Sequence, residues 1–293
     1  MKRSRFIKNS VLGGLFISSM KLKALNKLMD GPSTDTMPAL FLGHGSPMNA
    51  IEENEFVQGF RRIGSEVPKP KAILCISAHW ETRGTFVTAM EHPRTIHDFG
   101  GFPPELYQQQ YPAPGSPELA QKTVDTVESA DVGLDQQWGL DHGAWTVIRH
   151  MYPEADIPVV QMSLDRNKAA RFHYDLAREL KQLRNQGILI IGSGNMVHNL
   201  GMVAWNKMQE DDYAYDWARE ANENMKDFIL HDEHDKLIDY TSRGKAFLLA
   251  IPSPEHYLPL LYALALKGKD EGIQLFNDKA VAGSLSMTSV LIS

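Results

Sequence analysis

The chain has 293 residues, 43% of them hydrophobic and 23% charged, which is an ordinary composition for a globular protein with a sizeable core. Its formal net charge of −6 at pH 7 argues against nucleic acid as a partner. A single cysteine, Cys75, excludes internal disulfides and fits a reducing compartment such as the cytoplasm.

Residues 1–36 form a basic extension whose composition differs from that of the rest of the chain. A basic start is followed by a short apolar stretch from Val11 to Met20, which is too short to span a bilayer. Two interpretations stay open: a degenerate export signal, although no small-residue cleavage site follows, or an amphipathic extension. We expect a cytoplasmic protein, with export as the alternative, and assign residues 37–293 to one folded domain.

Short apolar segments alternate with longer amphipathic segments along this domain. We predict strands at residues 38–43, 72–78, 85–90, 157–163, 188–192 and 245–251. We predict helices at residues 52–64, 117–130, 166–185, 212–231 and 257–267. This alternation predicts a single α/β domain with three layers, in which helices cover both faces of a mostly parallel or mixed sheet.

The segment 91–115 does not fit either element type. It is rich in glycine, proline and aromatic residues and too irregular to form a packed helix or strand. Because long ordered loops in compact domains usually serve function, we expect this loop to border a site.

Four of the predicted strands lead to a histidine at or shortly after their last residue. These histidines are His44, His79, His198 and His256. The carboxyl ends of strands in an open α/β sheet form the crevice that binds ligands, so we expect the four side chains to converge there. We expect the histidines that follow no such strand to be ordinary loop or helix-surface residues, namely His92, His150, His173, His231 and His234.

Three of the converging histidines suggest a metal site. Neutral imidazole is the commonest protein ligand for metals, and His44, His79 and His256 together suit zinc, iron or nickel. A closed structural zinc site would usually need several cysteines, so an open, catalytic site is favoured. His198 is then either a fourth ligand or a free imidazole that acts as acid and base. Glycines on both sides of His44 would allow the tight turn that brings its ring into the crevice.

His142 lies next to Asp141 and between two tryptophans, in the segment "WGLDHGAW". It is either a loop residue whose ring is held by Asp141 or a further member of the site.

Six segments then match a known pattern: GHGSPMN, SAHWE, HDFGGFP, GLDHGAW, GSGNMVHNL and PSPEHYLPL. In this order, over residues 38–260, they resemble the motif set of the class III extradiol ring-cleavage dioxygenases, and more closely the 4,5-DOPA dioxygenase branch. The resemblance implies that residues 37–293 form an extradiol catalytic domain. It also implies insertion of O₂ into a DOPA-like catechol to give a muconate semialdehyde. The implied cofactor is one non-haem divalent metal, Fe(II) for turnover, with Zn(II) as a plausible bound species.

The resemblance also implies roles for single residues. His44, His79 and His256 match the metal ligands, and His198 matches an acid/base histidine that can approach the metal. His142 matches a histidine near the substrate hydroxyls. Glu255 precedes His256, so the choice between the two as third ligand stays open. The predicted substrate contacts are His97, Asp98, Phe102 and Tyr257.

Two other functions stay open on the residues alone. A zinc hydrolase would use metal-bound water as the nucleophile and His198 as the base. A binding protein of the same fold would have lost the metal. Consumption of O₂ with a catechol separates the dioxygenase from both, whereas the sequence identifies neither the physiological catechol nor the oligomeric state.

Overall fold

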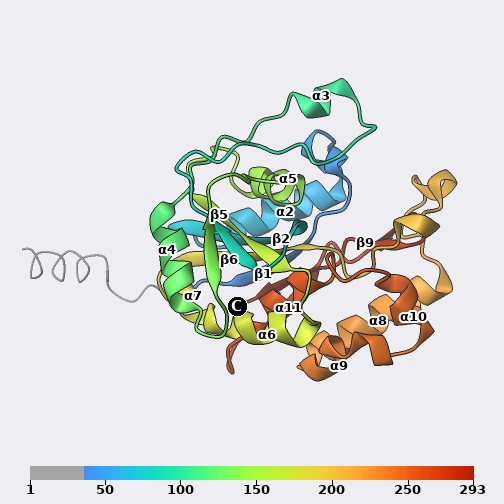
Figure 1. Cartoon of the computed structure of the whole chain (residues 1–293). Coiled ribbons are helices and arrows are strands. Elements are labelled where there is room, and N and C mark those ends of the chain that lie inside the picture. Colours follow the sequence, from blue (N-terminus) through green and yellow to red (C-terminus); the bar gives the residue numbers. More distant parts are fainter. Residues whose placement is uncertain (1–35) are drawn as a thin grey trace, which may run out of the picture.

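The computed structural model describes residues 36–293, and the extension predicted for residues 1–36 lies outside the described part except for Thr36. The described chain is built around an eight-stranded sheet with the order β4-β3-β5-β2-β6-β1-β10-β7 (Figure 1). Its strands are β1 (Ala39–Gly43), β2 (Ala72–Thr82), β3 (Thr85–Thr88), β4 (Val132–Asp135), β5 (Val159–Asp165), β6 (Ile188–Gly194), β7 (Ile273–Phe276) and β10 (Ser289–Ile292). A separate two-stranded sheet pairs β8 (Ala280–Val281) with β9 (Leu285–Ser286).

The centre of the large sheet is parallel and its flanks are mixed. Strands β5, β2, β6 and β1 pair in parallel, whereas β10 is antiparallel to both β1 and β7, and β3 is antiparallel to β5. Because the four central strands run the same way, their carboxyl ends share one edge of the sheet.

Helices cover both faces of this sheet (Figure 1). The helices are α2 (Glu55–Glu66), α3 (Pro104–Tyr107), α4 (Pro117–Thr126), α5 (His142–Met151), α6 (Ala170–Glu179), α7 (Lys181–Arg184), α8 (Asp216–Leu230), α9 (His234–Ile238), α10 (Lys245–Ala250) and α11 (Leu258–Ala265). Helices α2 and α5 contribute to the hydrophobic cluster on one face, and α4, α6, α8, α10 and α11 contribute to the cluster on the other.

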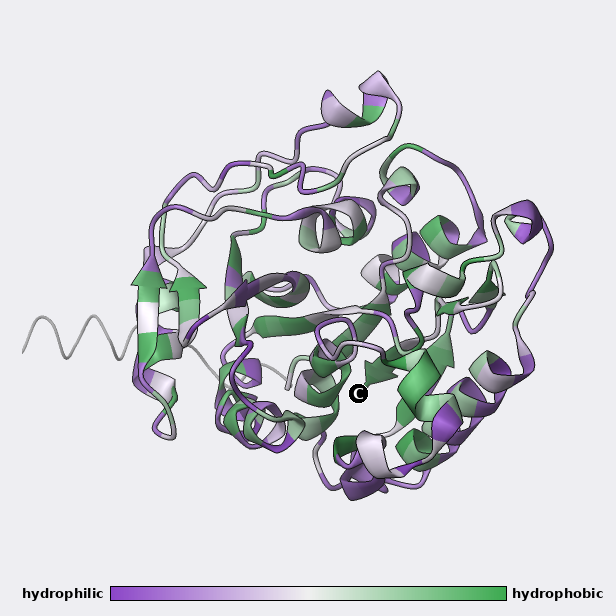
Figure 2. Cartoon of the chain, turned by 45° about the vertical axis from the view of Figure 1, so that its right-hand side comes forward, coloured by the Kyte–Doolittle hydropathy of each residue, from purple (hydrophilic) through white to green (hydrophobic). Residues whose placement is uncertain are grey.

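The central strands are mostly apolar and almost entirely buried, because helices cover both of their faces. In β1, Ala39 and Phe41 belong to one cluster while Leu40 and Leu42 belong to the other. The alternation follows from the two-residue period of a strand, and the hydropathy view shows the apolar strands enclosed by helices with polar outer faces (Figure 2). The predicted single α/β domain with helices on both faces of the sheet is confirmed. Among the described residues, no helix has both the length and the apolar character needed to cross a membrane.

The strand predicted at 245–251 is wrong, because these residues form helix α10 and its C-cap. The segment Lys-Ala-Phe-Leu-Leu-Ala contains no β-branched residue and, apart from Phe247, consists of good helix formers. Its buried residues are Ala246, Phe247 and Ala250, while Leu248 is 51% exposed. This spacing is helical, and it shows that a short apolar run alone does not separate a strand from a helix.

The structure also contains elements that the sequence patterns did not predict. The short strands β4 and β7 form the two edges of the sheet, and the short strand β10 lies between β1 and β7. Helix α5 occupies residues interpreted as a loop around His142. The segment 91–115 is irregular as expected, with only the four-residue helix α3 inside it.

Candidate metal centre

His44 enters the crevice directly from the end of β1. Its backbone N–H donates to the carbonyl of Gly194 at 3.0 Å, which continues the pairing of β1 with β6 by one residue. Gly45 adopts φ +64°, a left-handed conformation that favours glycine. At Gly43, an added Cβ would lie 2.5 Å from the carbonyl oxygen of Met287. The two glycines therefore allow the close turn that was expected, and the ring of His44 is 2% exposed.

His79 lies in a locally irregular part of β2. The pairing of β2 with β6 ends at Ser77, and its pairing with β5 shifts register between Ile76 and Glu81. Such bulges bend a strand and redirect its side chains, and they are common beside active sites. The irregularity thus carries His79 over the edge of the sheet, where its side chain is 19% exposed.

His256 arrives from the loop between α10 and α11 rather than from a strand. The carbonyl of His256 accepts a hydrogen bond of 2.8 Å from the N–H of Asn195, just beyond β6. The Oε1 of Glu255 lies 3.2 Å from Nδ1 of His256. The end of β6 thereby positions the backbone of this loop, and Glu255 contacts the neighbouring imidazole.

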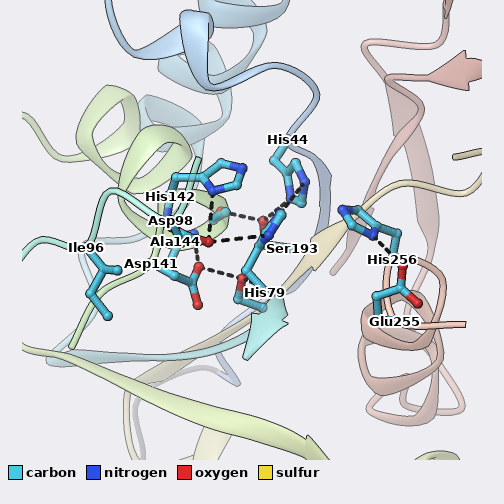
Figure 3. Close-up of polar contacts among 12 residues, drawn as sticks. His44, His79, Ile96, Asp98, Asp141, His142, Ala144, Ser193, Glu255 and His256 are labelled. Atoms are coloured by element: carbon cyan, nitrogen blue, oxygen red, sulfur yellow. Dashed lines mark hydrogen bonds and ion pairs between the residues drawn. The ribbon is translucent and has the colours of Figure 1, made fainter. Parts of the chain in front are cut away.

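Residues His44, His79 and His256 meet in one crevice at this edge of the sheet (Figure 3). One potential ligand atom from each lies within 4.8 Å of the others. The ring centroids are 5.0 Å apart for His44 and His79, 5.3 Å for His44 and His256, and 4.9 Å for His79 and His256. Three imidazoles from distant parts of the sequence therefore surround one point.

Two overlapping groups satisfy the same distance criterion: His79, Asp98 and His142, and His198, Glu255 and His256. In each of them a carboxylate contacts a histidine of its own group, 3.0 Å between Asp98 and His142 and 3.2 Å between Glu255 and His256. The group of His44, His79 and His256 contains no carboxylate that could pair with one of its imidazoles.

Burial keeps the central imidazoles neutral. It lowers the pKa of His44 well below its usual value, with the neighbouring His79 adding to the effect. The pKa of His79 is lowered for the same reason, burial first and then His142. Neutral imidazole is the form that binds metals.

The arrangement of the ring nitrogens also fits a cation. The Nε2 atoms of His44 and His79 face each other at 3.3 Å. Asp98 Oδ2 lies 3.4 Å from Nδ1 of His79, and a carboxylate oxygen there favours a proton on Nδ1 and a lone pair on Nε2. The lone pair on Nε2 of His79 then faces Nε2 of His44. A positive ion held between the two nitrogens would stabilise this arrangement, so the nitrogen donors fit a divalent metal.

Helix α5 carries His142 into the same crevice as its first residue. The side chain of Asp141 caps this helix by accepting from the N–H of Ala144 at 3.1 Å, and the hydroxyl of Ser77 donates to Asp141 at 2.6 Å. Nδ1 of the His142 ring lies 3.0 Å from Asp98 Oδ2, and the backbone N–H of His142 donates to Asp98 Oδ1 at 2.8 Å. His142 is thus held by Asp98, and not through its ring by the adjacent Asp141.

His198 stacks on His256 on the other side of the crevice. Their ring centroids are 3.6 Å apart and the ring planes are 8° from parallel. Burial, together with His256, lowers the pKa of His198 to about 3. Burial would raise the pKa of Glu255, but its hydrogen bond with His256 and other bonds lower it to about 2, which keeps the carboxylate charged.

The loop at 91–115 supplies an aromatic border to the crevice, as expected from its composition. The ring of Phe99 lies edge-on to the ring of His142, with the centroids 5.5 Å apart. It also lies edge-on to the ring of Phe102, again with the centroids 5.5 Å apart. His97 sits behind Phe99, with its Nε2 atom 2.9 Å from the carbonyl oxygen of Gln109. The predicted contacts Phe102 and His97 therefore lie beside the crevice.

Two predicted placements do not hold in the structure. Tyr257 was expected to contact substrate, but it is 1% exposed and its hydroxyl donates to the carbonyl of Leu237 at 3.0 Å, within the core. His173 was expected on a helix surface, but it is completely buried with its ring 3.1 Å from the hydroxyl of Tyr262.

A buried serine of the cluster was not among the predicted site residues. The hydroxyl of Ser193 lies 3.0 Å from Nδ1 of His44. Its signal in the sequence was a serine inside the buried strand that precedes His198, since a polar residue there needs a partner.

Comparisons with known proteins agree with the geometry. Residues 38–289 match the family model described as the catalytic LigB subunit of aromatic ring-opening dioxygenase. A 4,5-DOPA dioxygenase extradiol of Escherichia coli (strain K12) is 48% identical over 264 residues, covering 89% of this chain and 96% of the relative. A protein of the same name from Beta vulgaris is 36% identical, covering 88% of this chain and 97% of the relative.

A solved structure shares the fold. The crystal structure of an uncharacterized protein from Escherichia coli K12 matches with a TM-score of 0.76 and 44% sequence identity, covering 88% of this chain and all of the other. Both the match along the sequence and the convergence of the histidines lead to one assignment. The chain belongs to the LigB family of aromatic ring-opening dioxygenases, within the extradiol class III group that includes the 4,5-DOPA dioxygenases.

Proposed function

We propose that this metal-dependent extradiol dioxygenase cleaves a catechol with a DOPA-like side chain and uses Fe(II) for turnover. The observation that carries the proposal is the cluster of His44, His79 and His256, flanked by one further imidazole on each side. The names of the similar proteins from Escherichia coli and Beta vulgaris support the choice of DOPA as the first substrate to test.

In this proposal His44, His79 and His256 hold the metal through their Nε2 atoms. Glu255 contacts Nδ1 of His256, so it orients this ligand and does not replace it. Three protein ligands leave coordination positions open for both oxygens of a catechol and for O₂. When bound, Fe(II) supplies the electron transfer between catechol and O₂, which redox-inert Zn(II) does not supply.

The flanking imidazoles handle protons. The ring of His198 stacks in parallel on the ring of the proposed ligand His256. In this proposal His198 therefore lies beside the metal site without being one of the three ligands. Burial lowers the pKa of the free imidazole, but the negative charge that a catechol develops as it loses a proton beside His198 favours the imidazolium. His198 therefore accepts a proton as the catechol binds and returns it during ring opening. His142, held by Asp98, hydrogen-bonds the other substrate hydroxyl.

The aromatic border positions the ring of the substrate. Phe99 and Phe102 lie edge-on to each other at the side of His142, and such faces bind an aromatic ring through apolar and edge-to-face contacts. Both atoms of O₂ end in the product, a ring-opened muconate semialdehyde, so one O₂ is consumed for each catechol cleaved.

The test combines metal loading with an oxygen electrode. Protein purified without air and loaded with Fe(II) should consume one O₂ per L-DOPA and form a coloured semialdehyde, while the Zn(II)-loaded protein should do neither. Comparing the rates of O₂ uptake with dopamine, protocatechuate and unsubstituted catechol shows how far turnover depends on the DOPA side chain. Hydrolysis of an ester panel without O₂ uptake would instead support the hydrolase considered from the sequence.

A further inference from the structure

The buried hydroxyl of Ser193 joins the proposed ligand His44 to the first turn of helix α5. Ser193 lies near the end of β6 and is completely buried. Its Oγ is 3.0 Å from Nδ1 of His44 and 2.5 Å from the carbonyl oxygen of Gly143 (Figure 3). We propose that Ser193 is a positioning residue that selects the tautomer of His44 able to bind the metal through Nε2.

The direction of the two hydrogen bonds follows from counting protons. A serine hydroxyl has one hydrogen, and a backbone carbonyl can only accept. The bond of 2.5 Å to Gly143 therefore uses the hydrogen of Ser193. Toward His44 the same oxygen can then only accept, so the hydrogen on that line belongs to Nδ1 of the imidazole.

This assignment determines what His44 presents to the crevice. A neutral imidazole has one N–H, so a proton on Nδ1 leaves a lone pair on Nε2. That atom faces Nε2 of His79 at 3.3 Å. In the opposite tautomer the Nε2–H of His44 would donate to His79 and occupy the direction in which the metal is held. By keeping the proton of His44 on Nδ1, Ser193 prevents a hydrogen bond from Nε2 of His44 to Nε2 of His79. Such a bond between two ligands would compete with metal binding.

The same arrangement is present at the other two proposed ligands, but with charged acceptors. Asp98 lies near Nδ1 of His79 and Glu255 near Nδ1 of His256. Ser193 is a neutral acceptor for the most buried of the three rings. An uncharged group there avoids placing a third carboxylate in a fully buried position.

Ser77 offers a matched control on the neighbouring strand. It is the direct cross-strand partner of Ser193, and it is also completely buried. Its hydroxyl donates to Asp141 at 2.6 Å and accepts a long bond of 3.3 Å from the backbone N–H of His79, so its hydrogen bonds go to a carboxylate and to the backbone and not to an imidazole ring. Replacing either serine by alanine removes one buried hydroxyl, but only Ser193→Ala removes the acceptor on His44.

The first measurement is Co(II) affinity of the full chain, by titration against a competing chelator. Ser193→Ala should weaken binding by about 10–100-fold, the usual effect of losing a partner of a ligating histidine. Ser77→Ala should bind close to wild type even where its unfolding midpoint falls as much as that of Ser193→Ala. Unchanged affinity in Ser193→Ala, or an equal loss of affinity in both variants, would overturn the proposal.

The second measurement needs no serine variant and therefore no assumption about its folding. In metal-free protein labelled with nitrogen-15 at histidine, the long-range proton–nitrogen spectrum reports which ring nitrogen carries the hydrogen. The signals of His44 are assigned by their loss in His44→Gln. His44 should be protonated on Nδ1, and a proton on Nε2 would overturn the proposal.

The inference depends on the proposed metal site but fails separately from it. If wild-type protein does not bind Co(II), the ligand assignment is wrong, while the tautomer of His44 is still measured in the metal-free protein. If wild type binds Co(II) and His44 carries its proton on Nε2, the metal site stands and the role of Ser193 is refuted.

Discussion

Replacing His198 by glutamine tests whether this residue carries a proton or binds the metal. Glutamine keeps a similar volume and can hydrogen-bond, but it does not exchange a proton near neutral pH. Because His198 stacks face-to-face on His256 at 3.6 Å, and because His44, His79 and His256 form a ligand group without it, we expect His198→Gln to retain the metal.

The expected loss is in turnover. Removing a general acid–base group typically lowers kcat by about 10²–10⁴-fold, which corresponds to about 3–5 kcal/mol in the activation barrier. The stacking contact with His256 is lost as well, but that contact contributes only about 1 kcal/mol, so it does not account for a loss of this size.

The assay measures three quantities on one preparation: iron content, the dissociation constant of a catechol under anaerobic conditions, and O₂ uptake. We expect wild-type iron content and catechol binding with a large fall in O₂ uptake. Iron lost in proportion to activity would show that His198 is a ligand. Near-normal ring cleavage at full iron content would refute any proton-transfer role for His198.

Three further predictions concern single contacts. Glu255→Gln should keep most of the metal, because the amide oxygen can still accept from Nδ1 of His256, whereas His256→Ala should empty the site; metal analysis showing the reverse would make Glu255 the ligand. Tyr257→Phe should leave KM unchanged and lower stability by about 1 kcal/mol, since it removes only the hydrogen bond to the carbonyl of Leu237; a raised KM would restore a substrate role. Burial lowers the pKa of His173 to about 4, so the unfolded chain takes up a proton at higher pH than the folded one and stability falls as pH drops from about 6.5 to 4. His173→Gln should therefore lose about 2 kcal/mol less than wild type between pH 7 and pH 5, as measured by urea unfolding.

The positions of the histidines were predictable because strand ends are local features of a sequence. His44 and His79 follow runs of apolar residues long enough to identify as buried strands, and parallel strands bring such ends to one edge. His256 reached the same crevice by a route that was predicted wrongly, since helix α10 precedes it. The prediction succeeded there because the loop is fixed to β6 through Asn195, a contact between distant segments.

What remained hidden were the partners of the histidine rings. Asp98 was predicted to contact substrate because it lies in the aromatic loop, and nothing in the local sequence shows that its carboxylate turns toward His79 and His142. The contact of Ser193 with His44 joins residues 149 positions apart. Such contacts depend on the register of β1 and β6 and on where helix α5 begins, and neither was predicted.

The contacts of Asp98 with two imidazoles lead to a prediction that separates binding of substrate from support of the metal site. Oδ1 of Asp98 accepts from the N–H of His142, while Oδ2 faces Nδ1 of both His142 and His79. In Asp98→Asn one of these oxygens becomes an NH₂ group, so either the backbone bond is lost or a donor faces two ring nitrogens.

A residue that binds substrate would raise KM when replaced and leave the metal in place. Asp98 instead contacts two imidazoles, so Asp98→Asn should weaken metal binding by about 10–100-fold. At saturating Fe(II) it should lower kcat more than it raises KM for the catechol, because His142 is no longer held in one orientation. The measurements are a metal titration and steady-state O₂ uptake at several Fe(II) concentrations. A large rise in KM with unchanged metal affinity would refute the support of the proposed ligand His79 by Asp98.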